Sequence, residues 1–489
     1  MPRTLRALHP LGSRPNVTGT YATFFVASGI HLSTLPTVLM TLRPLFQSVF
    51  IHLALALVCA SSISCSQAPR HNATPPNILF IAIDDLNDWV GVLHGHPDTK
   101  TPSIDRLAAE GTVFTNAHAQ APLCWPSRAS LMSGLRPSTT GIYGITDDED
   151  LRAASPLMDS TAFLPEYFGR HGYETMGIGK LFHTHAPKGV FEESGGRYPG
   201  FGPYPDKRFH WDQEGTSTDW GPFPDSTVEM PDYQSASWII ERLNQTHDRP
   251  FFLAVGFLRP HVPWYVPQEW FDLHPIDSVA VPPYLPGDMD DIPETGIEMA
   301  TVPPMPTTEW AIKSGQWPAI VQGYLASVSF VDAQVGRILD ALEASVYAHN
   351  TIVVLFSDHG YHLGEKNRFA KHALWERATR VPLVVSGPGL PKGRLVSAPV
   401  ELLDIYPTLV DLTGFPENKW NEGVSLAPLM EDPDAPWPHA AITTYGRNNH
   451  GIAVEGYRYI RYEDGTEEFY DHASDPNEWH NLAGDEAYR

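Results

Sequence analysis

The sequence predicts an α/β fold with a large mixed, mostly parallel sheet between layers of helices, and a small antiparallel sheet near the C-terminus. Two observations carry this prediction. Continuous apolar runs that end abruptly in polar residues alternate with helical patterns, as in sheets buried on both faces. After about residue 439 the pattern changes to short alternating strands joined by turns. The 46 prolines and 38 glycines add many loops to this framework.

The apolar runs give the expected strands of the large sheet, and the periodic stretches give its helices. We expect strands at residues 76–83, 173–178, 250–257, 351–356 and 381–385. We expect helices at residues 101–111, 129–132, 232–243, 322–344 and 400–414. The small sheet is expected from strands at 441–446, 451–454, 457–462 and 468–470.

Length and charge bound the function. A chain of 489 residues with 42% hydrophobic content can bury a large core. The net charge of −24 argues against nucleic acid as a partner. An anionic substrate would need local cations against this background.

The first 65 residues are expected to precede the folded part. Residues 1–39 are interpreted as an upstream extension, and residues 40–65 as a signal peptide with a charged start and an apolar centre. The segment ends in Ser61-Ser-Ile-Ser64-Cys65, close to a lipoprotein box, so Cys65 is a candidate lipid anchor. The alternative is a membrane anchor, but the apolar run is short for a spanning helix. We therefore expect an exported protein, periplasmic or secreted.

The cysteines point to one residue of the mature chain. Of Cys59, Cys65 and Cys124, only Cys124 lies beyond the leader, so a disulfide framework is excluded there. Pro126 suits the first turn of a helix, which places Cys124 just ahead of a helix N-terminus that favours an anion. The alternative is a buried cysteine preceding a helix.

Polar side chains follow four of the expected strands. The carboxyl ends of parallel strands meet at one edge of a sheet, where ligands bind. Carboxylates from separate strands would suit a hard cation, and the basic residues would suit an anionic ester. These side chains form four pairs, Asp84 and Asp85, Lys180 and His183, Arg259 and His261, and Asp358 and His359. Each pair taken alone is also typical of a helix cap or a turn.

These stretches resemble the sulfatase family, closest to its iduronate-2-sulfatase-like branch. The resemblance covers nearly the whole mature chain. Its matching stretches are Asn77 to Asp85, Cys124-Trp-Pro-Ser-Arg128, Gly172 to His183, Arg259-Pro-His261, Ser357-Asp-His-Gly360, Leu363-Gly-Glu365, Lys371, Ala378-Thr-Arg-Val-Pro382 and Asp475 to Leu482.

The resemblance implies an alkaline-phosphatase-like fold, with a catalytic domain at 75–430 and the antiparallel sheet at 439–489. It implies that a maturation enzyme oxidises Cys124 to formylglycine, whose hydrate attacks the sulfur of a sulfated saccharide. The implied metal is one Ca²⁺, with Mg²⁺ as the alternative. The ligands would be Asp84, Asp85, Asp358, His359 and modified Cys124.

Further roles follow from the same resemblance. Arg128 would hold the hydrated aldehyde, and Lys180 and Lys371 would bind sulfate oxygens. His183 and His261 would serve proton transfer and sulfate contact. The loops at 206–224 and 282–317, rich in Trp, Tyr and Pro, are expected to shape the sugar subsites.

Two departures from the family pattern stand out. Other branches have Asn where this chain has His359, and a ring nitrogen is an unusual calcium ligand. The chain also ends at Arg489, where relatives usually continue into a final helix.

Three alternatives stay open. A phosphatase or phosphodiesterase of the same fold would usually use Ser or Thr as the nucleophile, and often more than one metal. A sulfatase-like glycan-binding protein without turnover would keep Cys124 unoxidised. A purely structural exported protein would not need so many converging polar residues.

Overall fold

A computed structural model describes residues 75–302 and 304–488. The upstream extension at 1–39, the signal peptide at 40–65 and the candidate lipid anchor Cys65 lie outside the described residues. Those three interpretations therefore stay predictions. The described residues belong to one compact unit.

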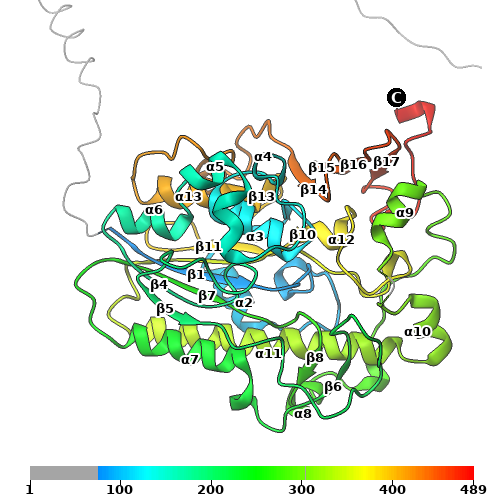
Figure 1. The fold of residues 1–489 in the computed structure, drawn as a ribbon, viewed down its shortest axis with the longest axis horizontal. Coiled ribbons are helices and arrows are strands. Elements are labelled where there is room, and N and C mark those ends of the chain that lie inside the picture. The colour runs from blue at the N-terminus through cyan, green and yellow to red at the C-terminus, as the bar shows by residue number, and fades with distance from the viewer. Residues whose placement is uncertain (1–74, 303, 489) are drawn as a thin grey trace, which may run out of the picture. The chain divides into compact units, whose positions relative to one another are not determined.

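The centre of the fold is a sheet of eight strands in the order β12-β2-β11-β9-β1-β7-β4-β5 (Figure 1). The run β9-β1-β7-β4-β5 is parallel, whereas β11 is antiparallel to both β9 and β2. The mixed, mostly parallel sheet is thus confirmed. Its strands are β1 (Asn77–Ile83), β2 (Gly111–Phe114), β4 (Glu174–Gly179), β5 (Glu193–Gly196), β7 (Phe251–Gly256), β9 (Thr351–Ser357), β11 (Leu383–Ser386) and β12 (Arg394–Val396).

Both faces of this sheet are buried, because successive side chains of a strand point to opposite sides. In β1, Ile78 and Phe80 pack in one core, and Leu79 and Ile81 pack in the other. The first core is covered by α3 (Cys124–Ser133), α6 (Leu164–Arg170) and α13 (Ile405–Leu412). The second is covered by α2 (Pro102–Ala109), α7 (Pro231–Leu243) and α11 (Trp317–Ala344). Figure 1 shows these two helical layers above and below the strands.

The remaining helices are short and lie in the connections. They are α4 (Pro137–Thr140), α5 (Pro156–Ser160), α8 (Gln268–Phe271), α9 (Glu294–Ala300), α10 (Thr308–Ser314), α12 (Glu376–Thr379) and α14 (Ala427–Glu431). Among the described residues, no helix is both long enough and apolar enough to cross a bilayer.

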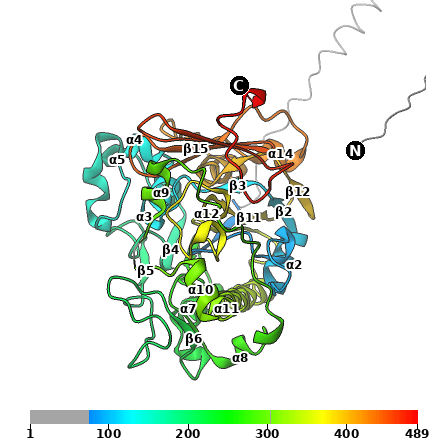
Figure 2. The same cartoon turned by 90° about the vertical axis from the view of Figure 1, so that its right-hand side faces the viewer.

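The small antiparallel sheet is confirmed near the C-terminus, at the top of the view in Figure 2. Its order is β14-β15-β16-β17, with every neighbouring pair antiparallel. The strands are β14 (Ala441–Thr444), β15 (His450–Val454), β16 (Tyr457–Arg461) and β17 (Glu467–Asp471). Two further small sheets join β3 (Ala117–His118) to β10 (Arg380–Val381) and β13 (Val400–Glu401), and β6 (Trp220–Pro222) to β8 (Trp264–Val266).

Candidate active site

Two neighbouring strands bring the predicted carboxylates together. β1 and β9 run parallel with Ile83 opposite Ser357, so Asp84 and Asp358 leave the sheet side by side. The backbone N–H of Asp85 donates to Asp358 Oδ1 at 3.2 Å. All three aspartates are buried.

A bend in the backbone aims Asp85 into the site. Its φ of 62° lies in the left-handed region, which a non-glycine residue adopts at a cost. The hydroxyl of Tyr324, on α11, donates to the Asp85 carbonyl at 2.9 Å and accepts from the N–H of Asn87 at 3.0 Å. The long helix therefore holds this bend from the other side of the sheet.

Cys124 is the first residue of α3, and extended Leu123 is the N-cap. The sequence predicted helix at 129–132 with the cysteine ahead of the helix start, whereas the observed helix is longer and includes the cysteine. The thiol is 3% exposed, and burial raises its pKa. Ser127, one turn along, donates its hydroxyl to the Asp358 carbonyl at 2.5 Å. The helix start is thereby fixed to the end of β9.

Arg128 ties α3 to the ends of three strands. Its Nε donates to Asp358 Oδ2 at 2.7 Å, and its Nη2 lies 3.6 Å from Asp84 Oδ1. Its Nη1 donates to the carbonyl of Lys180, directly after β4. The guanidinium thus holds the acidic groups and the helix in one arrangement.

Two buried lysines face the carboxylates. Lys180 Nζ contacts Asp84 Oδ2, and Lys371 Nζ lies 2.7 Å from Asp85 Oδ1 and 2.9 Å from Cys124 Sγ. Burial alone would lower the pKa of Lys371, but Asp85 and Cys124 raise it well above its ordinary value. Lys371 is therefore a cation beside the thiol at neutral pH.

The adjacent aspartates differ in proton affinity. Burial would raise the pKa of Asp84, but the Lys180 cation and its neighbours hold it well below the ordinary value. Burial raises the pKa of Asp85 to about 7; Lys371 opposes this shift and the Asp84 charge adds to it. The pair favours one firmly ionised carboxylate beside one that is easily protonated.

His359 has the tautomer that a metal ligand needs. Its Nδ1 faces the Gly360 carbonyl at 3.0 Å, and because a carbonyl oxygen only accepts, this nitrogen carries the proton. Its Nε2 then turns a lone pair towards Cys124 Sγ at 3.2 Å and Asp85 Oδ1 at 3.3 Å. A backbone carbonyl that orients a histidine in this way is typical of metal centres.

His261 has the same tautomer on the opposite side of Asp85. Its Nδ1 donates to the Val262 carbonyl at 2.5 Å, and its Nε2 lies 3.9 Å from Asp85 Oδ2. Its ring stacks on Phe201 at 4.0 Å between centroids. Burial holds its pKa well below the ordinary value, and Lys371 lowers it further, so Nε2 is a free proton acceptor.

His183 lies at the edge of the site and is half-buried. Its ring packs edge to face on Trp125 at 5.4 Å, and burial, with the Lys180 charge, lowers its pKa to about 4. Asp148 accepts hydrogen bonds from the backbone of His183 and Thr184 at 3.2 and 3.0 Å. A neutral imidazole is thus held on a fixed loop.

The donor set fits a divalent cation. Donor atoms of Asp84, Cys124, Asp358 and His359 lie within 4.8 Å of one another, and the same holds for Asp84, Asp85, Cys124 and His261. Among the described residues, Asp84 Oδ1 and Asp85 Oδ2 are buried without a hydrogen-bond partner. Buried oxygens of this kind need a ligand, and carboxylate oxygens are what Ca²⁺ and Mg²⁺ prefer.

Sequence reasoning missed the supporting carboxylates. Asp232, expected only as a helix start, accepts from the backbone N–H groups of Leu258 and Arg259 at 2.8 and 2.9 Å and so places the His261 loop. The guanidinium of Arg259, expected at the site, instead donates to the backbone carbonyls of Tyr265 and Phe201. The sequence signal for Asp232 was only its place at the expected start of a helix, which does not show that it binds the loop before His261.

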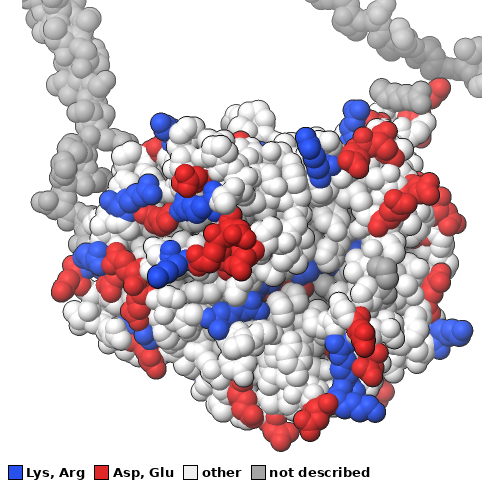
Figure 3. Space-filling model, in the orientation of Figure 1, with Lys and Arg blue, Asp and Glu red and all other residues white. Residues whose placement is uncertain are grey.

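The surface carries the matching charge. Figure 3 shows lysine and arginine side chains on the floor of a hollow in the middle of this face, with acidic side chains on the surrounding surface.

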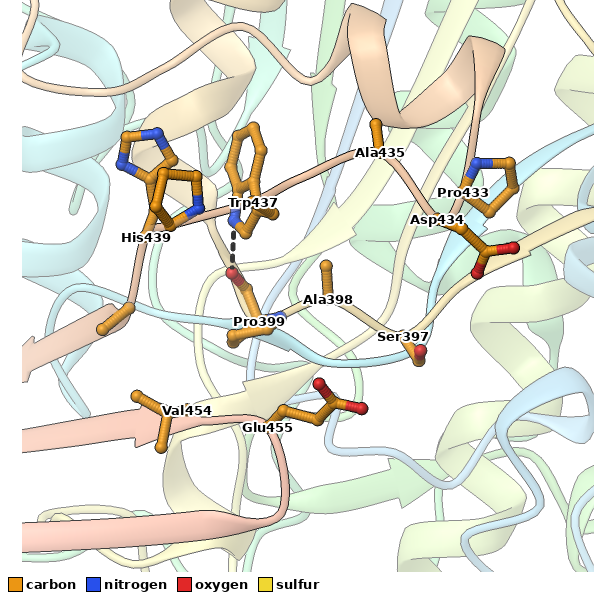
Figure 4. Close-up of a pocket in the computed structure, with 12 residues that line it drawn as sticks. Ser397, Ala398, Pro399, Pro433, Asp434, Ala435, Trp437, His439, Val454 and Glu455 are labelled. Atoms are coloured by element: carbon orange, nitrogen blue, oxygen red, sulfur yellow. Dashed lines mark hydrogen bonds between the residues drawn. The ribbon is translucent and has the colours of Figure 1, made fainter. Parts of the chain in front are cut away.

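A separate cavity of about 500 Å³ lies beside β13, β14 and β15, where Trp437 donates to the Pro399 carbonyl at 2.9 Å (Figure 4). No predicted site residue lines that cavity.

Comparison with known proteins agrees with this geometry. The family model described as Sulfatase matches residues 76–415, and the model of the N-sulphoglucosamine sulphohydrolase C-terminal region matches residues 364–489.

Three similar proteins illustrate the relationship. A sulfatase of Formosa agariphila is 57% identical over 83% of each chain, and the iduronate 2-sulfatase of Homo sapiens is 32% identical over 75% of this chain and 74% of its own. A protein solved with its substrate D-glucosamine-2-N,6-O-disulfate is 23% identical, with a TM-score of 0.66 over 85% of this chain and 94% of its own. That last likeness concerns the fold. The chain therefore belongs to the sulfatase family and is a sulfuric ester hydrolase with the alkaline-phosphatase-like fold.

Proposed function

We propose that this sulfatase removes sulfate from a sulfated saccharide, in the manner of iduronate 2-sulfatase, with Cys124 converted to formylglycine and one Ca²⁺ bound. The observation that carries the proposal is the convergence on Cys124. Lys371 Nζ and His359 Nε2 lie 2.9 and 3.2 Å from its sulfur. Beside them are two buried carboxylate oxygens that have no hydrogen-bond partner within residues 75–302 and 304–488.

The proposed metal ligands are Asp84, Asp85, Asp358, His359 and modified Cys124. A divalent cation held there would act as a Lewis acid on the ester oxygens and would lower the pKa of the attacking hydroxyl. Ca²⁺ is proposed ahead of Mg²⁺ because most of the proposed ligands are carboxylate oxygens of the protein. Mg²⁺ usually keeps several water ligands and binds through only one or two carboxylates.

The chain's own residues supply charge and protons. Lys180 and Lys371 are buried cations, suited to hold sulfate oxygens in a site that excludes water. The free Nε2 of His261 is suited to accept or return a proton, as is neutral His183 at the rim. Arg128 contacts Asp358 and Asp84, so we propose that it also holds these carboxylates in place at the edge of the sheet. This role is in addition to its predicted contact with the hydrated aldehyde.

The similarity to iduronate 2-sulfatase supports a sulfated uronic acid as the substrate. The loops at 206–224 and 282–317 are proposed to form the sugar subsites. Export to the periplasm or beyond, a maturation enzyme for Cys124 and a lipid anchor at Cys65 are parts of the same proposal.

Two measurements test this function. Release of sulfate and of phosphate from matched aryl esters should favour sulfate, and preference for phosphate would support a phosphatase. Mass spectrometry of the Cys124 peptide, from cells that can modify it, should show the aldehyde. A free thiol in protein from such cells would support a glycan-binding protein without turnover.

A further inference from the structure

Arg368 is a buried guanidinium with unused donors. The side chain is 6% exposed, and its Nη2 donates to the backbone carbonyl of Lys371. Among the described residues, its Nε and Nη1 have no hydrogen-bond partner. Leaving charged donors unpaired in the interior is costly, so such a group points to a missing ligand.

Two of the other buried arginines of the described chain lie beside carboxylates: Arg128 lies 2.7 Å from Asp358, and Arg458 lies 2.9 Å from Glu478. The third, Arg259, donates from its Nε, Nη1 and Nη2 to backbone carbonyls. Arg368 has no carboxylate within 4.0 Å in residues 75–302 and 304–488. Burial lowers its pKa to about 10, with only tyrosine side chains opposing the shift.

A cavity of about 290 Å³ lies against Arg368. The loop that carries Lys371 forms one wall. Residues within 289–302 and 305–307 form the other wall, with apolar side chains such as Ile297, Val302 and Met305. Lys366 also lines the cavity, but its Nζ is 2.7 Å from Asp288 and is therefore neutralised. The volume is near the lower end of ligand pockets, roughly 300–1,000 Å³.

The cavity is linked to the nucleophile through one residue. The backbone carbonyl of Lys371 accepts from Arg368, and the ammonium of Lys371 contacts Cys124 Sγ at 2.9 Å. One lysine side chain thus separates the two positions. A saccharide whose ester lies at Cys124 could extend a neighbouring group to Arg368.

We propose that Arg368 and this cavity form a second anion subsite, which binds a carboxylate or a further sulfate group of the saccharide. The guanidinium fork matches either group in a bidentate way. The apolar wall suits the C–H face of a sugar. The identity of the ligand rests on the proposed function, whereas the subsite rests on the unpaired guanidinium.

Binding to the metal-loaded full-length protein tests the subsite without turnover. The probes are a uronic acid disaccharide without sulfate esters, its carboxyl-reduced analogue, and that reduced analogue with one sulfate ester. Calorimetry should show that Arg368→Gln weakens binding of one or both charged probes at least tenfold and leaves the reduced analogue nearly unaffected. Loss for only one charged probe identifies which anion is bound. Equal affinity of wild type and variant for all three probes would overturn the proposal.

Kinetics separates binding from positioning of Lys371. With 4-nitrophenyl sulfate and a sulfated uronate disaccharide, the loss of kcat/KM in Arg368→Gln should be at least tenfold larger for the disaccharide, mainly through KM. Equal losses would mean that Arg368 only positions Lys371. Arg368→Lys keeps the positive charge but not the bidentate guanidinium, so its kcat/KM for the disaccharide should lie between those of wild type and Arg368→Gln. This variant keeps the test valid if Arg368→Gln misfolds. Lys392→Gln, an exposed charge change, is the matched control. Absence of sulfate release by wild type would refute the proposed function but not the binding result.

Discussion

Two buried ionic clusters lie at opposite ends of the loop that carries Lys371, and they differ in what they leave unpaired. In the C-terminal cluster, Arg458 lies between Glu376 and Glu478, and Glu478 also accepts from the backbone N–H of Glu376 at 2.8 Å. In the active-site cluster, Asp84 Oδ1 and Asp85 Oδ2 have no hydrogen-bond partner among the described residues. In the first cluster the carboxylate oxygens are paired with cations of the chain, whereas the second cluster keeps carboxylate oxygens available for a ligand.

The largest effect should follow from removing the nucleophile. Cys124→Ala is expected to lower kcat on the order of 10³-fold or more, because the covalent route is lost. The fold should persist, since alanine fits the space of a small buried side chain. Sulfate release and thermal unfolding of the same preparation check both points. Activity within tenfold of wild type would exclude residue 124 as the nucleophile.

Breaking the C-terminal cluster should cost stability instead. Arg458→Met removes the arginine that buried Glu478 and half-buried Glu376 share, which should lower the free energy of unfolding by roughly 3–5 kcal/mol. Arg249, whose exposed pair with Glu192 has a separation of 2.7 Å, is the control, and Arg249→Met should cost less than about 1 kcal/mol. Denaturant titrations measure both. A similar small cost for the two variants would remove the distinction between the clusters.

Calcium should stabilise one cluster and ignore the other. At a hundredfold excess over Kd, a cation bound only by the native state adds about 2.7 kcal/mol to the free energy of unfolding. Asp85→Asn should abolish this gain and EGTA should reverse it in wild type, whereas Glu478→Gln should retain it. An unchanged calcium response in Asp85→Asn would contradict the proposed ligand set.

The smallest expected effect concerns pH. Burial lowers the pKa of His118, beside the C-terminal cluster, from 6.5 to about 3, with Glu376 opposing the shift and Arg458 adding to it. Below pH 6.5 the unfolded chain binds a proton that the native chain refuses, so stability falls as pH decreases. Between pH 6.5 and 5 the loss should be about 2 kcal/mol. Unfolding of His118→Gln should show a correspondingly flatter slope over this range, and an identical slope would contradict the assignment.

The parts of the site that lie on regular elements could be predicted from the sequence. The apolar runs located β1 and β9, and parallel pairing then brings Asp84 and Asp358 to one edge. Helix α11 begins at Trp317 rather than 322, because a proline in its first turn is compatible with an earlier start. The helix expected at 400–414 was wrong at its start, since Val400 and Glu401 pair with β3 instead.

The parts that depend on loops could not be predicted. Lys371 meets Asp85 across 286 residues of sequence, and no periodicity marks the segment that carries it. Lys366 and Asn367 take left-handed φ values of 54° and 53°, set by tertiary contacts rather than by local propensity. Likewise, whether Arg368 has a carboxylate partner depends on which residues the tertiary structure brings near it, and the sequence alone does not show this.

The burial of α3 constrains the order of events in the life of the protein. All ten residues from Cys124 to Ser133 are buried, so a modifying enzyme cannot bind this segment in the native chain. Oxidation of Cys124 would have to precede folding, and folding would be in competition with the modifying enzyme for the newly made polypeptide. Faster folding would then yield more protein that is native in shape but permanently inert. The fraction of active molecules would be decided during synthesis.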